Sequence, residues 1–364
     1  MQIAEIISFL ESIAPPSLQE SYDNAGLLTG NPGWKCTGVI VSLDATEAVV
    51  KEAIEKKCNL IIAHHPIIFG GLKKITGRNY VEQTVIASIK NDIAIYAVHT
   101  NLDNVIHGVN NRIADQLGLI NRKILQPKTG LLKKLFTFVP FEFAEKVRTA
   151  IFNAGAGSIG NYSECSFNAA GEGTFKAGEG TDPFVGEIGV RHTGNEIKIE
   201  VIFPSWLQNK LLNAMIKAHP YEEVAYDIIS LDNAYQGTGS GLVGDLPAAL
   251  DEVAVLQLLK DKFGVPVIRH TRLLGKMVEK LAVCGGAGSF LTKAAIAAGA
   301  DFYISSDIKY HEFFDAENRL VLADIGHYES EQFTIDLLAE FLEEKFPTFA
   351  VLKTGVKTNP VQYF

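Results

Sequence analysis

Short apolar strands alternate with helices at both ends of the chain, and this alternation constrains the fold more than any other feature. In the first third, residues 38–43 (GVIVSL) and 60–63 (LIIA) are apolar and rich in β-branched side chains, and residues 46–57 between them have apolar positions at helical spacing. Strands this short and this uniformly apolar are typical of a parallel sheet covered by helices on both faces. We therefore expect an α/β fold.

The same alternation returns in the last third of the chain. Strands of both ends stop at polar residues, as in AHHP and VHTNLD near the N-terminus and ISSD and DIGHYES near the C-terminus. The pattern predicts two similar three-layer α/β lobes, residues 1–127 and 237–364. The further expected elements are helices 81–90 and 109–117 and strand 93–98 in the first lobe, and strands 281–284, 302–305, 320–325 and 349–353 and helices 291–298 and 328–345 in the second.

The middle of the chain, residues 128–236, has a different pattern. Glycine-rich turns separate longer strands, and in residues 196–203 apolar side chains alternate with charged ones, as in a sheet with one solvated face. We interpret this segment as an inserted α+β domain with the β-α-β-β-α-β order of a ferredoxin-like fold. The order rests on strand 134–139, helix 141–154, helix 205–218 and strand 224–231.

Composition excludes several functional classes. The net charge of −9 and the pI near 5.5 argue against a general nucleic-acid surface, so direct nucleic-acid binding is not expected. No run approaches the roughly 18 apolar residues of a membrane helix, and the N-terminus reads as an amphipathic helix rather than a signal peptide. The four cysteines form no CxxC pair, which is typical of reduced core residues. We expect a soluble, cytoplasmic protein.

Two adjacent histidines follow one of the predicted strands. His64 and His65 come directly after Ala63, and Pro66 favours an extended backbone at His65. Side chains at the carboxyl edge of a parallel sheet face the crevice in which α/β proteins bind ligands. Neighbours in an extended chain point to opposite sides, so two nearby ions suit this pair better than one. Taken alone, the pair is equally compatible with loop histidines that bind nothing.

A second strand end carries Asp103 in the sequence HTNLD. A carboxylate has two oxygens and can bridge two cations, although a single loop aspartate is often a helix cap or a turn residue. His99 lies at the same strand end. It is interpreted either as a supporting or proton-transfer residue for the site, or as a buried, hydrogen-bonded histidine.

A third strand end supplies His327 and Glu331 in DIGHYESEQF. If a helix starts near Tyr328, these residues lie one turn apart on the same face and can bind a common centre. Glu329 is interpreted as a helix-dipole carboxylate. Three imidazoles and two carboxylates exceed the three protein ligands usual for one catalytic zinc ion, so we predict two divalent ions about 3.5–4 Å apart. Zinc is the first expectation, and iron and manganese suit the same ligands.

Other polar residues are weaker predictions. Asp307 and His311 in DIKYHE follow another strand and are possible substrate or proton-transfer groups. The amides of Gly285 and Gly286 in GGAGS would suit a phosphate, but a tight turn explains these glycines equally well. A basic group that could offset a triphosphate, or simply be solvated, consists of Lys73, Lys74 and Arg78.

The combination of HHP, HTNLD, GHYESE and the early YDNAGLL (residues 22–28) resembles the GTP cyclohydrolase 1 type 2, or Nif-three-like, family over both lobes. The resemblance implies a dinuclear metal centre and assembly into toroidal homohexamers built from trimers. It also implies that the insertion is similar to the ferredoxin-like cation-tolerance and nitrogen-signalling proteins, whose sequences resemble HPYEEVAYD (219–227). No metal is assigned to His219. The residues that the resemblance makes metal ligands are His64, His65, Asp103, His327 and Glu331.

The resemblance further implies a function. A metal-dependent hydrolase of this kind would direct a metal-activated hydroxide at C8 of the guanine ring of GTP and release formate, so a small nucleotide is the expected substrate. Two alternatives stay open. One is a dinuclear-metal phosphohydrolase acting on nucleotides, and the other is a non-catalytic, metal-binding regulatory or scaffold protein in which the insertion senses a ligand.

Overall fold

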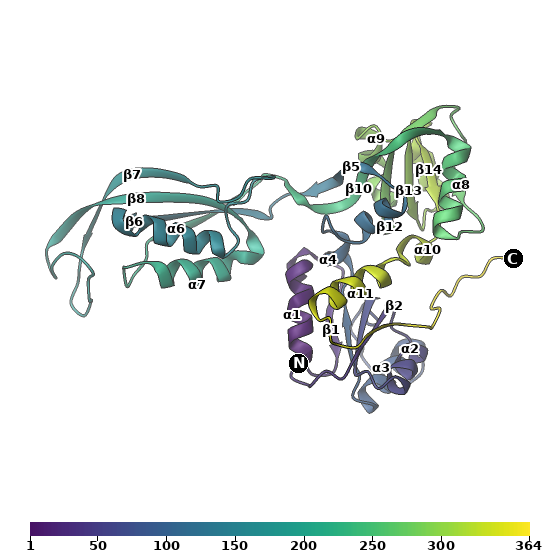
Figure 1. Cartoon of the computed structure of the whole chain (residues 1–364), viewed down its shortest axis with the longest axis horizontal. Helices are drawn as coiled ribbons and strands as arrows, with labels where there is room; N and C mark the ends of the chain where they lie inside the picture. The colour runs from purple at the N-terminus through teal and green to yellow at the C-terminus, as the bar shows by residue number, and fades with distance from the viewer. The chain divides into compact units, whose positions relative to one another are not determined.

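The computed structural model describes residues 1–364, and the chain folds into two compact units; Figure 1 labels many of their elements. One unit joins Met1–Pro127 to Gly237–Phe364, and the other is Lys128–Gln236. None of the helices combines the length and the apolar character needed to cross a membrane.

A five-stranded sheet forms one half of the first unit. Its strand order is β1-β4-β3-β2-β15, in which β2, β3, β4 and β15 run parallel and β1 is antiparallel to β4. Alternate residues of the buried strands face two different cores, one under α1 and α11 and the other under α2 and α3. The elements are α1 (Ile3–Ile13), β1 (Gly26–Thr29), β2 (Val39–Asp44), α2 (Glu47–Glu55), β3 (Leu60–His65), α3 (Tyr80–Lys90), β4 (Ala94–Ala97), α11 (Thr334–Lys345) and β15 (Val351–Lys353).

A six-stranded sheet forms the other half. Its order is β11-β14-β13-β12-β10-β5, with β12, β13 and β14 parallel, β10 antiparallel to β12 and β11 antiparallel to β14. One face packs on α5 and α8, and the other packs on α9 and the 3-10 segments η4 and η5. The elements are α5 (Val109–Gln116), β5 (Ile120–Lys128), β10 (Tyr235–Asp251), α8 (Glu252–Phe263), β11 (Arg269–His270), β12 (Met277–Ala287), η4 (Ser289–Leu291), α9 (Thr292–Ala297), β13 (Phe302–Ser306), η5 (Tyr310–Ala316) and β14 (Val321–Asp324).

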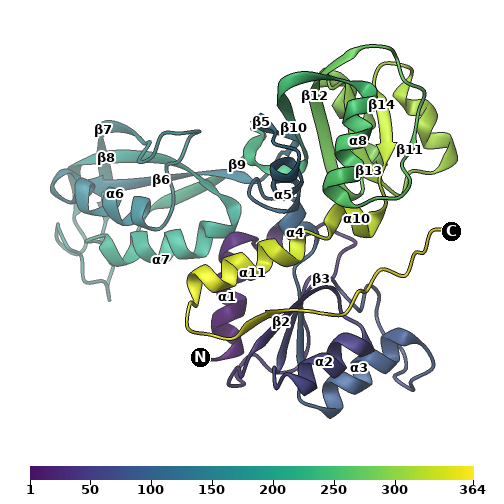
Figure 2. The same cartoon turned by 45° about the vertical axis from the view of Figure 1, so that its right-hand side comes forward.

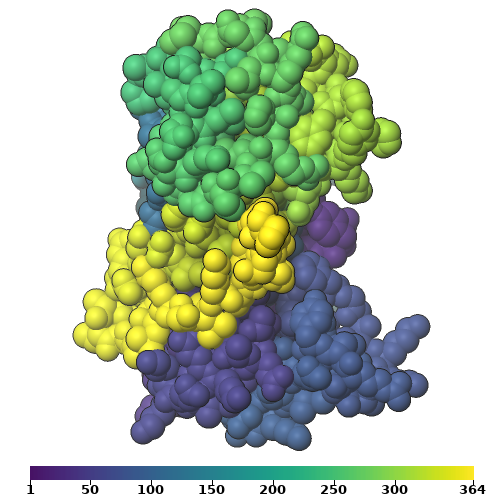
Figure 3. Space-filling model, turned by 90° about the vertical axis from the view of Figure 1, so that its right-hand side faces the viewer, coloured from purple at the N-terminus to yellow at the C-terminus, as the bar shows by residue number.

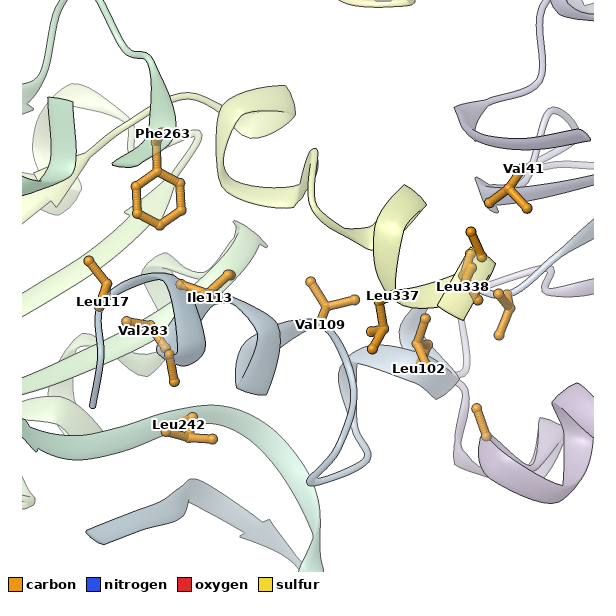
Figure 4. Packing of buried hydrophobic residues seen from close by; sticks show 14 of the residues in the cluster. Val41, Leu102, Val109, Ile113, Leu117, Leu242, Phe263, Val283, Leu337 and Leu338 are labelled. Atoms are coloured by element: carbon orange, nitrogen blue, oxygen red, sulfur yellow. The ribbon is translucent and has the colours of Figure 1, made fainter. Parts of the chain in front are cut away.

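The two halves exchange elements instead of following the boundary predicted between residues 1–127 and 237–364. Strand β15, at the end of the chain, pairs with β2, and β5 joins the second sheet. One hydrophobic core runs through both halves (Figure 4), and it includes Val41, Leu102, Ile113, Val283 and Leu338. The exchange has a physical basis, because α11 returns the chain to β2 and buries Leu337 and Leu338 on the way.

The helix predicted at 328–345 is broken in the structure. A short helix, α10 (His327–Glu331), contacts β12 and β13, and α11 starts at Thr334 and packs on β2 and α5. Figure 2 shows α10 between the two sheets. The break lets one segment serve both halves, which the continuous apolar pattern of the sequence does not reveal.

The second unit, Lys128–Gln236, is a four-stranded antiparallel sheet in the order β7-β8-β6-β9 with two helices. The predicted alternation along β8 is confirmed, because Ile199, Val201 and Phe203 are buried against the helices. This order and the β-α-β-β-α-β sequence of elements are ferredoxin-like, as predicted. The elements are β6 (Leu132–Pro140), α6 (Ala144–Asn153), β7 (Phe167–Lys176), β8 (Arg191–Pro204), α7 (Gln208–Ala218) and β9 (Tyr226–Leu231).

Candidate metal centre

The structure brings the five predicted metal ligands together. His64 and His65 are the last residues of β3, Asp103 ends the short helix α4 (Thr100–Asp103) after β4, and His327 and Glu331 are the two ends of α10. Potential ligand atoms lie within 4.8 Å of one another in two sets that share Glu331. The first set adds His64 and Asp103, and the second adds His65 and His327.

In the first set, the side chain of His64 is fully buried. Its Nδ1–H donates to the carbonyl oxygen of Val98 at 2.9 Å, which leaves Nε2 as the unprotonated nitrogen. Nε2 lies 3.6 Å from Oδ1 of Asp103 and 3.8 Å from Oε1 of Glu331. Neither His64 Nε2 nor Asp103 Oδ1 has a hydrogen-bond partner. Two buried acceptors that face each other without a donor fit a cation between them.

The second set surrounds the other oxygen of Glu331. Oε2 lies 3.0 Å from Nε2 of His65 and 3.1 Å from Nε2 of His327, and the two nitrogens are 3.3 Å apart. The two carboxylate oxygens of Glu331 therefore belong to different sets of ligands. Glu331 thus lies between the two sets of potential ligands, whereas the sequence suggested Asp103 as the bridging residue.

Each imidazole is oriented by a hydrogen bond on its far side. Nδ1 of His65 lies 2.8 Å from Oδ1 of Asp44, and Nδ1 of His327 lies 2.6 Å from Oδ2 of Asp307. Such carboxylate partners fix ring orientation and make the metal-binding nitrogen a better ligand. Sequence reasoning missed Asp44, although its position was readable: β2 ends at Asp44 where the neighbouring parallel strand ends at His65.

The electrostatics show how strongly this cluster attracts positive charge. Burial opposes charging of His65, but hydrogen bonds with Asp44 and Glu331 outweigh it and raise the pKa of His65 to about 9. The same balance, with Asp307 and Glu331 as partners, raises the pKa of His327 to about 11. Burial and then the charge of Glu331 raise the pKa of Asp103 to about 7. Without metal, protons occupy positions that divalent cations would take.

The other predicted catalytic residues separate into different roles. His99 lies with His64 and His65 in a third group of potential ligands, and its Nδ1 is 2.8 Å from Oδ1 of Asp23. Asp307 supports His327, as described above. His311 is exposed and packs against Tyr310 and Phe314, and it belongs to no group of potential ligands.

The glycine loop supports Glu331 and leaves no free amide for a phosphate at the predicted positions. The N–H groups of Gly285 and Gly286 donate to Asn110 Oδ1 and Ser330 Oγ, both at 3.0 Å. Gly286 has a φ of 65°, and a Cβ atom there would lie 2.4 Å from Oε1 of Glu331. The loop is therefore explained by close approach of the Glu331 carboxylate. The predicted basic group, Lys73, Lys74 and Arg78, is exposed and makes no ion pair with the centre.

Comparison with known proteins identifies the family. A family model for Duf34/NIF3 (NGG1p interacting factor 3) matches residues 1–360. The chain belongs to the Duf34/NIF3 family. A Bacillus subtilis relative named "GTP cyclohydrolase 1 type 2 homolog" is 41% identical over 326 residues, which are 89% of this chain and 87% of the relative. A Halalkalibacterium halodurans relative of the same name is 39% identical over 363 residues and 98% of both chains.

Solved Duf34/NIF3 structures agree with the fold. A Bacillus cereus protein related to NIF3 matches with a TM-score of 0.88 at 38% identity, over 100% of this chain and 99% of that chain. A Staphylococcus aureus protein matches with a TM-score of 0.78 at 28% identity and the same coverage. The family resemblance inferred from the motifs is thus confirmed over the whole chain.

The C-terminal tail of this Duf34/NIF3 chain adds a support that the sequence did not reveal. Oγ1 of Thr358 donates to Oδ2 of Asp44 at 2.5 Å, and Nδ2 of Asn359 donates to Oε1 of Glu329 at 2.9 Å. Figure 3 shows the yellow end of the chain on the surface between purple N-terminal segments and green segments of the second sheet. The tail therefore contacts both the carboxylate behind His65 and the helix that carries two of the potential ligands.

Proposed function

We propose that this Duf34/NIF3 protein is a hydrolase that holds two divalent cations side by side. The observation that carries the proposal is the position of Glu331, whose two oxygens face two separate sets of nitrogen and oxygen ligands. The donor set fits such ions, because His64 Nε2 and Asp103 Oδ1 are buried without partners. The absence of cysteine from both sets favours a catalytic over a structural site.

The residues of the centre would have different roles in the reaction. Two bound divalent ions would supply a water of lowered pKa and a polarising charge for the substrate. Asp44 and Asp307 hold His65 and His327 in their ligating orientation. His99 is held through Nδ1 by Asp23, so its Nε2 is the atom that we propose accepts and returns a proton.

The relatives' name suggests the substrate. We propose GTP, with hydrolysis at C8 of the guanine ring. One water would open the imidazole ring by breaking a C8–N bond and leave a formamide, and a second water would release formate and an amine. Phe69, whose side chain is 55% exposed, contacts His99 edge to face with 5.8 Å between ring centroids. Its free face offers a stacking surface for a purine beside the centre.

The direct test is turnover by metal-reconstituted protein. We expect the zinc, manganese or iron form to release formate from GTP, and His99→Gln to keep its metals while turnover falls by about 100-fold or more. His107→Gln, which changes an exposed histidine outside the centre, is the control. No formate with any of the three metals would overturn the cyclohydrolase proposal. Release of phosphate would favour a phosphohydrolase, and stable metals without turnover would favour a non-catalytic role.

A further inference from the structure

A cavity of about 500 Å³ lies in the second half of the first unit and includes none of the metal ligands. One wall is strand β11 with the two residues that follow it, and the other is η5 with the turn that leads into β14. A volume of this size is typical of sites for small organic ligands. The described chemistry of the metal centre makes no use of it.

The first wall carries fixed and free cationic groups. The guanidinium of Arg269 donates to Asp324 Oδ2 and to the carbonyl oxygen of Ile308, both at 2.9 Å, and packs 5.0 Å from the ring centre of Phe313. These contacts fix the guanidinium in place, and the side chain, which lines the cavity, is still 55% exposed and keeps unused N–H donors. Arg272 is exposed and has no ion-pair partner. Glu317 is the one carboxylate among the lining residues, so the two arginines leave the lining with a net positive charge in a chain whose net charge is −9.

The second wall is aromatic. Tyr310 is 71% exposed and Phe314 is 66% exposed, and their rings contact each other at 5.7 Å. Two large aromatic side chains are costly to leave in water and offer flat faces for stacking. The turn below them is strained, because Glu317 and Asn318 are consecutive non-glycine residues with φ values of 49° and 54°. Such strain is found where the surrounding structure has a reason to retain it.

We propose that this cavity binds a nucleoside monophosphate, with the base stacked on Tyr310 and Phe314 and the phosphate held by Arg272 and Arg269. An unpaired guanidinium recognises phosphate through charge-assisted hydrogen bonds, and exposed aromatic rings recognise any nucleobase by stacking. The cavity has room for one such ligand. The overall acidity of the chain favours a free nucleotide over a nucleic-acid strand.

Two contacts of Arg269, with Asp324 and with the carbonyl oxygen of Ile308, connect the site to the metal centre. Asp324, which binds Arg269, also accepts hydrogen bonds from the backbone N–H groups of Ile308 and Gly326. These residues adjoin Asp307 and His327 respectively. A phosphate bound to the remaining donors of Arg269 would therefore lie next to the loops that hold the second set of potential ligands.

The test is calorimetric titration of the full chain, stripped of metal with EDTA and dialysed, with guanosine monophosphate. We expect saturable binding that Arg272→Gln and Phe314→Ala each weaken about tenfold or more. Both side chains are exposed, so unchanged melting temperatures are expected and would show that the fold is intact. Arg191→Gln, which changes an exposed arginine in the other unit, should leave the affinity unchanged. Guanosine and inorganic phosphate should each bind about tenfold more weakly than the nucleotide.

Three results would overturn the proposal. They are no saturable binding at millimolar nucleotide, binding that neither variant weakens, and tighter binding of a single-stranded oligonucleotide than of the nucleotide. Because the protein in this titration holds no metal, failure here would not bear on the hydrolase, and absence of formate release would not bear on this cavity.

Discussion

Replacement of Glu331 by glutamine is the sharpest test of the dinuclear centre. The substitution keeps the size of the side chain and removes the one charge that both sets of ligands share. Oε1 then no longer offers an anion beside His64 and Asp103, and Oε2 no longer offers one between His65 and His327. The affinity for both ions should fall together, whereas loss of a ligand to one ion would lower mainly the affinity for that ion.

The magnitude follows from the geometry. Loss of an outer partner of a metal-binding histidine already lowers metal affinity about 10–100-fold. Loss of a shared anionic ligand should therefore lower the affinity for each ion by about 100-fold or more, which corresponds to about 3 kcal/mol of binding free energy. Without metal, a broken buried ion pair would cost about 3–5 kcal/mol of unfolding free energy. We expect about 2 kcal/mol, because removal of the Glu331 charge relieves Asp103, whose pKa that charge helps to raise.

Metal content by mass spectrometry, chelator competition and denaturant unfolding in EDTA measure these quantities. Glu329→Gln is the matched control, since Glu329 is a buried carboxylate of the same helix that binds Asn359 instead of the centre. If Glu331→Gln kept two ions at the wild-type affinity, Glu331 would not be the bridge.

Three further predictions concern the same centre. Protons on His65 and His327, with pKa values of about 9 and 11, compete with metal, so metal affinity should rise with pH from 7 to 9. In the metal-free protein, the raised pKa of His65 contributes about 3 kcal/mol to the unfolding free energy. This contribution is complete below pH 6.5 and should be lost as the pH rises through 9, which denaturant unfolding in EDTA can measure. Thr358→Val removes the hydrogen-bond donor to Asp44 and should lower metal affinity about tenfold in chelator competition. Thr354→Val, on the same tail, should leave metal affinity unchanged. Gly286→Ala should lower metal occupancy, since its new Cβ would displace Glu331; full occupancy would refute the close approach.

The sequence predicted which residues come together because each lies where local rules apply. His64 and His65 follow an apolar β-branched run, and parallel strands end at a common edge of a sheet. His327 and Glu331 needed only helical spacing. Their outer partners were harder to predict. Asp44 becomes visible only when β2 and β3 are aligned in register, and Asp23 reaches His99 across 76 residues of sequence from a segment without a regular pattern.

The sheet to which a strand belongs was also beyond sequence reasoning. Strand β15 has the same apolar character as the strands of the second sheet, yet it pairs with β2 of the first. The β-propensity of a segment reflects how its side chains pack and does not determine which strand it pairs with. The helix break before Thr334 decides the pairing, because α11 can then pack on β2 while α10 stays beside β12.

The shared core changes what metal removal is expected to do. If the two sheets met only through the ions, chelation would separate them. Instead, Leu102, Val109, Leu337 and Leu338 belong to one apolar cluster that includes residues of both sheets (Figure 4). Burial of this kind does not depend on metal. We therefore expect EDTA to lower the unfolding free energy of the first unit while its transition stays single and cooperative, and calorimetry that resolved two transitions within that unit would contradict a shared core. A core that fixes β3, α4 and α10 in advance leaves only side chains to be ordered by the ions, which is the arrangement that a preformed catalytic site requires.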